Sequence, residues 1–306
     1  MAGTITTGNI PRLLQEGLNR IFGATYDEHP KEFDKVFDTF ESRKSFEVDA
    51  QLEGLGLAPE KPEGDDVSFD SFRQGFTPKY DNLTYAKGFI VTKEAMADEL
   101  YGQLENRTRR LAFSMTQTKE VVAANVLNRG FNSSFTQIDG DGVELFSTAH
   151  INGPSGGTFS NKLAVDADLS EAALEDLLIV IGNATDPRGL QIALQGIRMV
   201  VPVALQFEAQ RILGSVLQNN TGNNATNAVR DMNALRDGFT VNHYLTDTDA
   251  WFIKTNSPDG MKYFTRQSVE FGEDNAFTSG NARMKADERY SFNWSDPRGM
   301  YASAGA

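Results

Sequence analysis

The fold of this chain is decided by one uninterrupted stretch, VTKEAMADELYGQLENRTRRLAFSMTQTKEVVAANVLNRG, which runs from Val91 to Gly130. Thr92 can cap the start of a helix, and Gly130 stands where a C-terminal cap belongs. No proline interrupts the stretch, which therefore predicts a helix of roughly 38 residues, about 55 Å long. Its apolar residues recur every four or seven positions and form one stripe: Met96, Leu100, Leu104, Leu111, Met115, Val122 and Val126.

A segment rich in glycine and proline precedes the helix. Two β-leaning runs, Ser45–Leu55 and Lys79–Val91, enclose the sequence GLAPEKPEGDDVSFDSFRQGFTP, from Gly56 to Pro78. Proline lacks an amide donor and glycine costs entropy to order, so we expect this segment to project as a loop. It nevertheless keeps a valine and three phenylalanines, which a solvated linker does not need. We expect the loop to become ordered on a neighbouring subunit through Pro59, Pro62, Gly64, Phe69 and Phe72.

The helix alone fits the centre of a globular enzyme equally well, because helix lengths vary widely. Together with the loop it is more typical of a shell-building subunit. At 306 residues and 40% hydrophobic content, the chain can bury a large core in one or two domains.

The composition excludes several classes of protein and site. No run of about 18 apolar residues predicts a membrane span, and the start MAGTITTGNI lacks the features of a secretory signal, so we expect the chain to be cytosolic when made. The absence of cysteine excludes disulfides, thiolate metal sites and cysteine nucleophiles. A net charge of -13 repels nucleic acid, so sequence-specific DNA binding is not expected.

Arg107, Arg109 and Arg110 form a basic cluster on the predicted helix, against the acidic balance of the chain. Arginine suits ion pairs with carboxylates, so the preferred interpretation is pairing with acidic neighbours, including those of another subunit. The alternative is an inward-facing patch that touches phosphates.

From Asp168 onward, predicted helices and strands alternate as in a compact α/β lobe. The segment Asp168–Gly182 has cap residues and an amphipathic stripe, and Pro202 can open a helix over Val203–Leu213. The polar run Ser215–Asn227 predicts a mobile loop. Strands are predicted at Ile197–Val201, Thr240–Leu245, Ala250–Lys254, Met261–Phe264 and Ala282–Ser295.

Motifs that carry chemistry are scarce. The three histidines, His29, His150 and His243, lie too far apart to show a metal-ligand spacing. Ser147 stands near His150, but no glycine-flanked nucleophile elbow surrounds it. The sequence DGDG at Asp139–Gly142 hints at calcium, yet the glutamate that a helix-loop-helix site needs at its twelfth position is replaced by His150, so a polar turn is predicted. We therefore assign no catalytic, cofactor-binding or metal residue and do not expect an enzyme.

Six segments in a consistent order resemble the major capsid proteins of tailed bacteriophages, in particular the Mu-like major head subunit branch. They span most of the chain, and they carry the resemblance jointly rather than singly. The segments are LAPEKPEGDD (Leu57–Asp66), YAKGFIVTKE (Tyr85–Glu94), DGVELFSTAH (Asp141–His150), IRMVVPVALQFEAQR (Ile197–Arg211), YLTDTDAWF (Tyr244–Phe252) and SDPRGMY (Ser295–Tyr301).

The resemblance implies an α+β major capsid fold divided into five parts. The long helix would be the spine of a peripheral domain, and the α/β lobe would be an axial domain that meets its copies around fivefold and sixfold axes. The implied limits are an N-terminal arm at 1–44, an extended loop at 45–90, the peripheral domain with its spine at 91–167, the axial domain at 168–264 and strands returning to the peripheral domain at 265–306.

The same resemblance implies a structural protein that assembles into pentamers and hexamers of an icosahedral head enclosing double-stranded DNA. Its partners would be copies of itself and a separate scaffolding protein, because no long helical scaffolding segment precedes the loop, together with a protease and a portal. It would be found in the virion capsid, assembled in the bacterial cytoplasm, without a cofactor and without a membrane. The alternatives are a nanocompartment shell, a soluble α/β hydrolase using Ser147 and His150, and an acidic interaction module.

Overall fold

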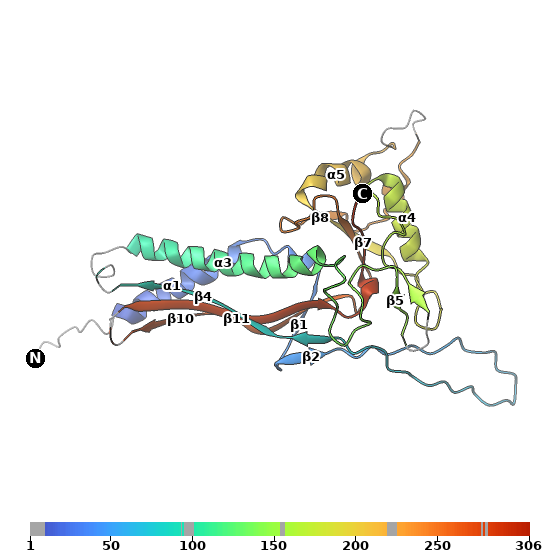
Figure 1. Cartoon of the computed structure of the whole chain (residues 1–306), viewed down its shortest axis with the longest axis horizontal. Helices are drawn as coiled ribbons and strands as arrows, with labels where there is room; N and C mark the ends of the chain where they lie inside the picture. Colours follow the sequence, from blue (N-terminus) through green and yellow to red (C-terminus); the bar gives the residue numbers. More distant parts are fainter. Residues whose placement is uncertain are drawn as a thin grey trace, which may run out of the picture.

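The molecule consists of a long body, a lobe at one end of it and a loop that projects from beside the lobe (Figure 1). This computed structural model describes residues 10–92, 94, 101–153, 157–218, 225–276, 278 and 281–306. The body and the lobe each contain a four-stranded sheet. Within the described ranges, no helix is long and apolar enough to cross a membrane.

The sheet of the body has the strand order β1-β10-β11-β4. Strands β10 and β11 form a long antiparallel hairpin, β4 pairs antiparallel with β11, and β1 adds in parallel to β10. Burial alternates along β11, where Met284 and Ala286 are buried while Arg283 and Lys285 are exposed. The period of two gives the sheet one buried face. The strands are β1 (Asp38–Glu41), β4 (Leu83–Val91), β10 (Met261–Asn275) and β11 (Ala282–Trp294).

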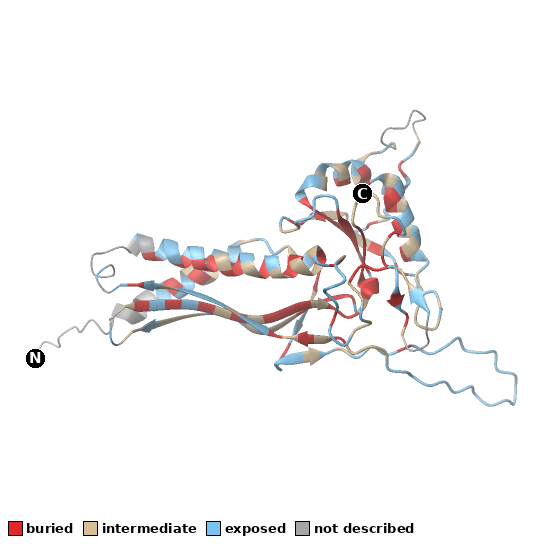
Figure 2. Cartoon of the chain, in the orientation of Figure 1, coloured by how far each residue is buried: buried red, intermediate tan, exposed pale blue. Residues whose placement is uncertain are grey.

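Helices α1 (Ile10–Glu28) and α3 (Tyr101–Asn128) cover that face. From α1, Phe22 and Tyr26 pack in one cluster with residues of α3 and with Ala286 of the sheet. Figure 2 shows the buried residues of α3 turned toward the sheet and its exposed residues turned away, as an amphipathic helix requires. The predicted N-terminal arm is thus, in its described part, largely packed on the body: α1 is followed by a 3-10 turn at Phe33–Lys35 and by β1.

The predicted start of the long helix is wrong, whereas its end is confirmed. Val91 is the last residue of β4 and pairs with Ala282, because the β-branched end of this run continues the sheet. Residues 95–100, which hold two positions of the predicted apolar stripe, lie outside the described residues. Helix α3 ends at Asn128, and Gly130 follows it so close to Phe146 that a Cβ would lie 2.5 Å from the ring. Only glycine fits there without displacing that ring.

A short hairpin at the base of the projecting loop joins β2 (Phe46–Val48) to β3 (Lys79–Asp81). The second predicted β run is divided at Asn82, which is buried between the hairpin and the body. Its side-chain amide donates to Ser42 Oγ at 2.8 Å, and Ser291 Oγ donates to its Oδ1 at 3.0 Å. This polar junction separates β3, which serves the hairpin, from β4, which serves the body.

The lobe contains a sheet of order β12-β9-β7-β8 and three helices. The predicted helix after Asp168 is confirmed, with Ser170 Oγ accepting from the Ala173 amide at 3.2 Å. After Pro202 the chain makes a 3-10 turn before the α-helix begins. Residues 219–224 of the predicted mobile loop lie outside the described residues. The elements are α4 (Glu171–Gly182), β7 (Gly196–Val201), α5 (Gln206–Gly214), α6 (Ala228–Asp231), β8 (Phe239–Val241), β9 (Trp251–Thr255) and β12 (Met300–Ser303).

The lobe sheet is buried on both faces and belongs to two cores. Met199, Trp251 and Tyr301 pack with the lobe helices. Their neighbours along the strands, including Val200 and Phe252, pack with the core of the body. The near-continuous apolar strands follow from this double burial.

Two segments lie in the opposite part from the one predicted. Met261–Phe264, expected in the lobe, opens β10 of the body sheet. The strand β12, expected to return to the body, pairs with β9 in the lobe. The physical reason is strand pairing between segments that are distant in sequence. Strand β10 runs for 15 residues alongside β11 in the body. Met300–Ser303 is the only described segment that covers the edge of β9.

Candidate assembly surfaces

The loop between β2 and β3 is the largest exposed segment among the described residues. Its base is a ladder of backbone hydrogen bonds, from the Asp49 amide to the Pro78 carbonyl (3.0 Å) and from the Gln51 amide to the Phe76 carbonyl (3.0 Å). Beyond the ladder, every residue from 54 to 74 is exposed. The predicted projection of this segment is confirmed, and Figure 1 shows it extending away from the lobe.

The loop carries large apolar side chains that no described part of the chain covers. Phe69 is 92% exposed, Leu57 80% and Phe72 67%. Gly64 adopts a φ of 92°, a region that favours glycine, and the adjacent Asp65 amide donates to the Pro62 carbonyl at 3.3 Å to close the turn. Pro59 and Pro62 are exposed as well. Apolar surface presented on a narrow loop is typical of a segment that is buried against a partner.

One side of the loop is braced against the lobe. Arg188, in the turn that follows α4, donates to the Asp70 carboxylate at 2.5 Å and to the Ser71 carbonyl at 2.8 Å. The Gly56 amide donates to the same carboxylate from the opposite limb at 3.0 Å. These hydrogen bonds, first those from the Gly56 and Ser71 amides and then that from Arg188, lower the pKa of Asp70 to about 2. The brace joins both limbs and fixes the direction in which the loop leaves the molecule.

A second surface is a groove between α1 and α3 near the opposite end of the body. The predicted arginine cluster lines it: Arg107, Arg109 and Arg110 are exposed, and none makes an ion pair with an acidic side chain that the structure describes. The other lining residues are Thr25 of α1, and Asn106 and Phe113 of α3. The groove has a volume of about 620 Å³, within the range of ligand-binding clefts.

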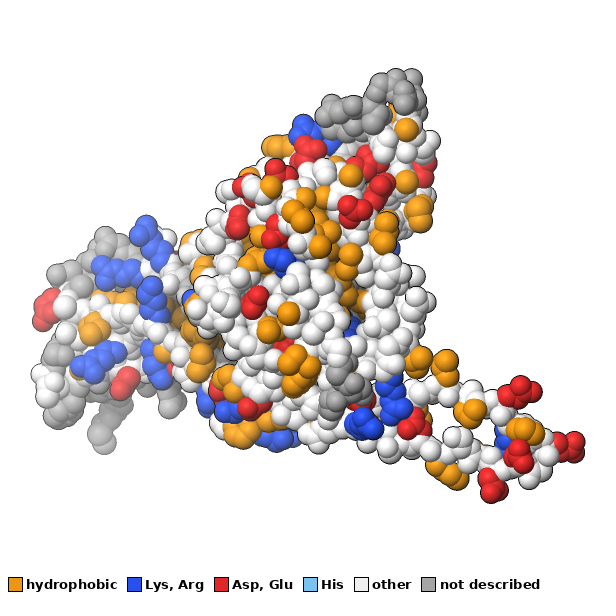
Figure 3. Space-filling view, turned by 45° about the vertical axis from the view of Figure 1, so that its right-hand side comes forward, with side chains coloured by type: hydrophobic (Ala, Val, Ile, Leu, Met, Phe, Trp, Pro, Cys, Tyr) orange, Lys and Arg blue, Asp and Glu red, His pale blue; other side chains and the backbone are white. Residues whose placement is uncertain are grey.

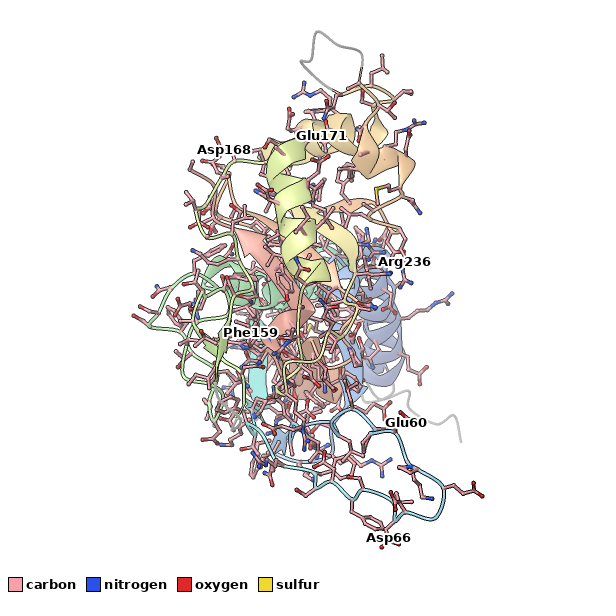
Figure 4. All side chains as sticks on the ribbon, turned by 90° about the vertical axis from the view of Figure 1, so that its right-hand side faces the viewer. Glu60, Asp66, Phe159, Asp168, Glu171 and Arg236 are labelled. Atoms are coloured by element: carbon pink, nitrogen blue, oxygen red, sulfur yellow. The ribbon has the colours of Figure 1, made fainter. Side chains whose placement is uncertain are left out.

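The lobe exposes apolar side chains on two sides. Phe207 of α5 is 69% exposed and Ile179 of α4 is 60% exposed. The two helices lie on different sides of the lobe in Figure 1. In Figure 4, Glu171 at the start of α4 and Arg236, in the turn before β8, lie on different sides of the lobe. Further exposed apolar residues near α5 and α6 are Val203, Val216, Leu217 and Met232, and those near α4 are Val165 and Ile192.

Buried charges connect α3 to the elements around it. Lys119 of α3 lies 2.6 Å from Glu288 of β11, and the Tyr26 hydroxyl of α1 donates to the same carboxylate at 2.9 Å. Burial alone lowers the pKa of Lys119, but Glu288 and the adjacent tyrosines outweigh it and raise that pKa above its ordinary value. The lysine is therefore a buried cation that holds α1, α3 and the sheet together.

The next residue of α3 binds the turn after α1. The Glu120 carboxylate accepts hydrogen bonds from the amides of Glu32 (2.9 Å) and Phe33 (3.1 Å). Burial raises the pKa of Glu120 to about 7, with Glu32 and Asp34 adding to the rise and the two amides opposing it. Glu32 in turn accepts from the amide of His243, in the lobe, at 2.9 Å. The three carboxylates and the histidine lie where the body, the turn and the lobe meet.

The pair Ser147 and His150 does not form a hydrolytic site. His150 is fully buried, with Nδ1 2.5 Å from Asp141 and Nε2 3.1 Å from the Leu145 carbonyl. The Ser147 hydroxyl instead accepts from the Ala149 amide at 3.4 Å. Both ring nitrogens of His150 thus face other groups, and the DGDG segment is a turn that supplies Asp141 to His150. The polar turn predicted there is confirmed by the positive φ of Asp139 (58°) and Gly142 (83°).

Sequence reasoning found the loop and the arginine cluster but missed the brace and the two exposed sides of the lobe. The brace joins residues 118 positions apart, which no local pattern reveals. The exposed apolar residues of α4 and α5 stand beside buried ones in the same short helices. One signal was available in the sequence: these helices contain more apolar residues per turn than a single buried face can hold.

Comparison with known proteins gives one family and one fold. The family model of the phage capsid protein matches residues 77–303. A sequence comparison with curated proteins finds no match.

Three solved structures illustrate the fold. A virus-like particle from Pyrococcus furiosus is 12% identical, with a TM-score of 0.55 over 94% of this chain and 98% of that one. The Mycobacterium phage Che8 protein is 16% identical, with a TM-score of 0.53 over 90% and 93%. The Mycobacterium phage Patience protein is 12% identical, with a TM-score of 0.54 over 99% and 89%.

Proposed function

The chain belongs to the phage capsid protein family, and on this premise we propose that its copies assemble as pentamers and hexamers of an icosahedral head enclosing double-stranded DNA. It is a structural protein of a capsid shell and not an enzyme. The predicted α+β capsid fold is confirmed. The assignment of the chain to the Mu-like branch of the family stays a prediction. The match of the family model over 77–303 carries the proposal.

The loop supplies the main contact between adjacent copies in this proposal. Phe69 and Phe72 become buried on the neighbour, and Pro59, Pro62 and Gly64 give the tip a shape that costs little entropy to order. The exposure of residues 54–74 supports the assignment, because the apolar side chains of the loop are not covered by any described part of their own chain.

The lobe closes the ring around each axis. Its two exposed apolar sides, the one with Phe207 and the one with Ile179, differ from each other. A contact between different sides of successive copies is head-to-tail and generates a ring when the rotation closes. Burial of these residues then contributes about 25 cal/mol for each Å² of apolar surface covered.

In this arrangement the body is the peripheral domain with α3 as its spine, and the lobe is the axial domain. The proposed domains keep the limits expected from the sequence, 1–44, 45–90, 91–167, 168–264 and 265–306, except that β10 is assigned to the body and β12 to the lobe. The remaining partners are proposed from the family: a separate scaffolding protein, a protease and a portal. The packaged DNA is enclosed without sequence-specific contact, and assembly takes place in the host cytoplasm.

The test is to express the chain with and without the other head genes of its genome, isolate the largest fraction by size exclusion and image it by negative-stain electron microscopy. Closed shells, or pentameric and hexameric rings, are the expected result. A monomer under both conditions contradicts the proposal. Particles that hold a cargo protein and never a genome indicate the nanocompartment alternative.

A further inference from the structure

The arginine groove combines three positive charges, and none of them pairs with a carboxylate among the described residues. Arg107 and Arg110 are three positions apart and share a face of α3 with Arg109 beside them, so their charges repel one another. By contrast, Arg188, Arg211 and Arg298 each pair with a carboxylate of their own chain. Lys87 of β4 adds a further cation near this helix and reaches Ser114 Oγ at 3.0 Å, not a carboxylate. The described part of the chain thus supplies no anionic group to neutralise the charge of this groove.

The tip of the loop has the complementary character. Between Pro59 and Val67 stand four carboxylates and a single lysine, and all of these residues are exposed. None of the four carboxylates makes an ion pair with a basic side chain that the structure describes, whereas Asp70 further along is held by Arg188. Figure 4 shows Glu60 and Asp66 on the two limbs near the end of the loop. The four carboxylates are Glu60, Glu63, Asp65 and Asp66.

The tip and the groove of one copy cannot meet. Figure 1 places the loop at the end of the molecule that carries the lobe, and the first half of α3, which supplies the arginines of the groove, toward the far end of the body. Figure 3 shows acidic side chains on the loop and Lys and Arg side chains gathered at that far end. The brace through Arg188 holds the loop in its outward direction. Any contact between these two surfaces therefore joins different copies.

We propose that the acidic tip, residues 60–66, of one copy docks in the arginine groove of a neighbouring copy. This inference rests on the proposed function and names the surface that receives the loop. Carboxylates bind guanidinium groups in two-pronged hydrogen bonds, which fix the register of the loop as well as its location. Phe113, 39% exposed beside the arginines, offers an apolar contact for Leu57 or Val67 next to the tip.

The absence of cysteine makes a direct test available. In the full chain, Glu63→Cys is combined with Arg110→Cys, and assembled particles are oxidised and run on a non-reducing gel. We expect a ladder of disulfide-linked multimers. The matched control combines Glu63→Cys with Arg283→Cys. Arg283 is an exposed arginine of β11 that alternates with Ala282 and Met284, which are buried under α1 and α3, so it lies on the opposite face of the sheet.

The control pair should yield at least about tenfold less cross-linked product. Particles that form normally but give no ladder, or the same ladder with both pairs, overturn this inference and leave the proposed function standing. Failure of the unmodified chain to form shells or rings with the other head proteins overturns the proposed function, and this inference with it.

Charge reversal separates a protein occupant from nucleic acid. Arg109→Glu should reduce the yield of assembled particles about tenfold, and Glu63→Arg in the same chain should restore most of it. Particles of Arg109→Glu that assemble at the normal yield but protect less DNA from nuclease would assign the groove to phosphates and overturn the inference. Circular dichroism of each variant before assembly shows whether the chain is folded.

Discussion

The body and the projecting loop use the same kinds of residue for opposite purposes. In the body, Tyr290 stacks on Tyr85 and Phe292 stacks on Tyr263 in a closed core. In the loop, Phe69 and Phe72 are as large and apolar but stand in solvent. These rings of the body are thus buried within one chain, whereas the rings of the loop remain exposed and available to another copy. The difference teaches that stability and assembly are assigned to separate segments, which mutations can test one at a time.

The strongest test removes the loop. Residues 54–73 are replaced by a short Gly-Ser turn, because the antiparallel bridge between Leu52 and Gln74 holds the two ends of the deletion close together. We expect assembly to be lost while the midpoint of thermal unfolding changes by a few degrees at most, because every removed residue is exposed. Size exclusion and calorimetry measure the two effects. A large loss of thermal stability would contradict the separation of roles.

The reciprocal test breaks the body and spares the loop. Lys119→Met leaves Glu288 buried without its cation, which should cost about 3–5 kcal/mol of unfolding free energy. The double variant with Glu288→Met should recover much of that loss, because no buried charge remains. Chemical denaturation measures both. Equal stability of the single variant and the unmodified chain would show that the pair does not hold the body together.

A matched pair of phenylalanine substitutions compares the two regions directly. Phe252→Ala removes a buried ring and should lower the free energy of unfolding by about 3–5 kcal/mol. Phe69→Ala removes an exposed ring and should leave that free energy within about 0.5 kcal/mol, while reducing the yield of particles. The comparison fails if both substitutions destabilise the isolated chain equally.

A smaller effect is expected from pH at the junction of body and lobe. The pKa of Glu120 is about 7 in the folded chain and 4.5 as its ordinary value, so between these values the folded state binds more protons than the unfolded state. This carboxyl group therefore favours folding most below about pH 4.5, and its contribution is lost as the pH rises to about 7. Glu32, Asp34 and His243 face the same junction.

Thermal unfolding of the unmodified chain and of Glu120→Gln, followed from pH 4.5 to 8, isolates the part due to Glu120. The difference in stability between the two should shift in favour of Glu120→Gln as the pH rises to 7, and then level off. Parallel curves across the whole range would refute the role given to this carboxyl group.

The smallest effect concerns the brace of the loop. Asp70→Asn weakens the contact with Arg188 at an exposed site, so the thermal midpoint of the whole chain should be unchanged within error. The loop should nevertheless be cleaved faster by a protease, because its base is less restrained. Time courses on a gel measure the rate, with Glu60→Gln at the unbraced tip as the control.

The sequence was informative where a pattern is local. The spacing of apolar residues predicted α3, and proline and glycine predicted the loop. Helix α1 was missed although Leu18, Phe22 and Tyr26 recur every four residues, which is the same signal. Pairing between distant segments was out of reach, because alternation identifies a strand without naming its partner.

Candidate surfaces were predicted in the same uneven way. The arginines were visible as a cluster in sequence. Only the folded chain shows that they pair with no carboxylate among the described residues. The loop phenylalanines were recognised because they contradict the polar composition around them. The two sides of the lobe were not, since Ile179 follows directly after buried or half-buried residues of α4 and only the packing of that helix shows which residue turns outward.

The lobe sheet, shared by two cores, has a mechanical consequence. Val200 and Phe252 anchor it in the body while Met199 and Trp251 anchor it under the lobe helices, so the two parts form one stiff lever. Among the described residues, a force on the lobe near a symmetry axis would pass through this shared sheet into the body. Any change in the size of a shell built from this chain must therefore be distributed over the joints between levers, at the loops and their receiving surfaces, while each lever keeps its own shape.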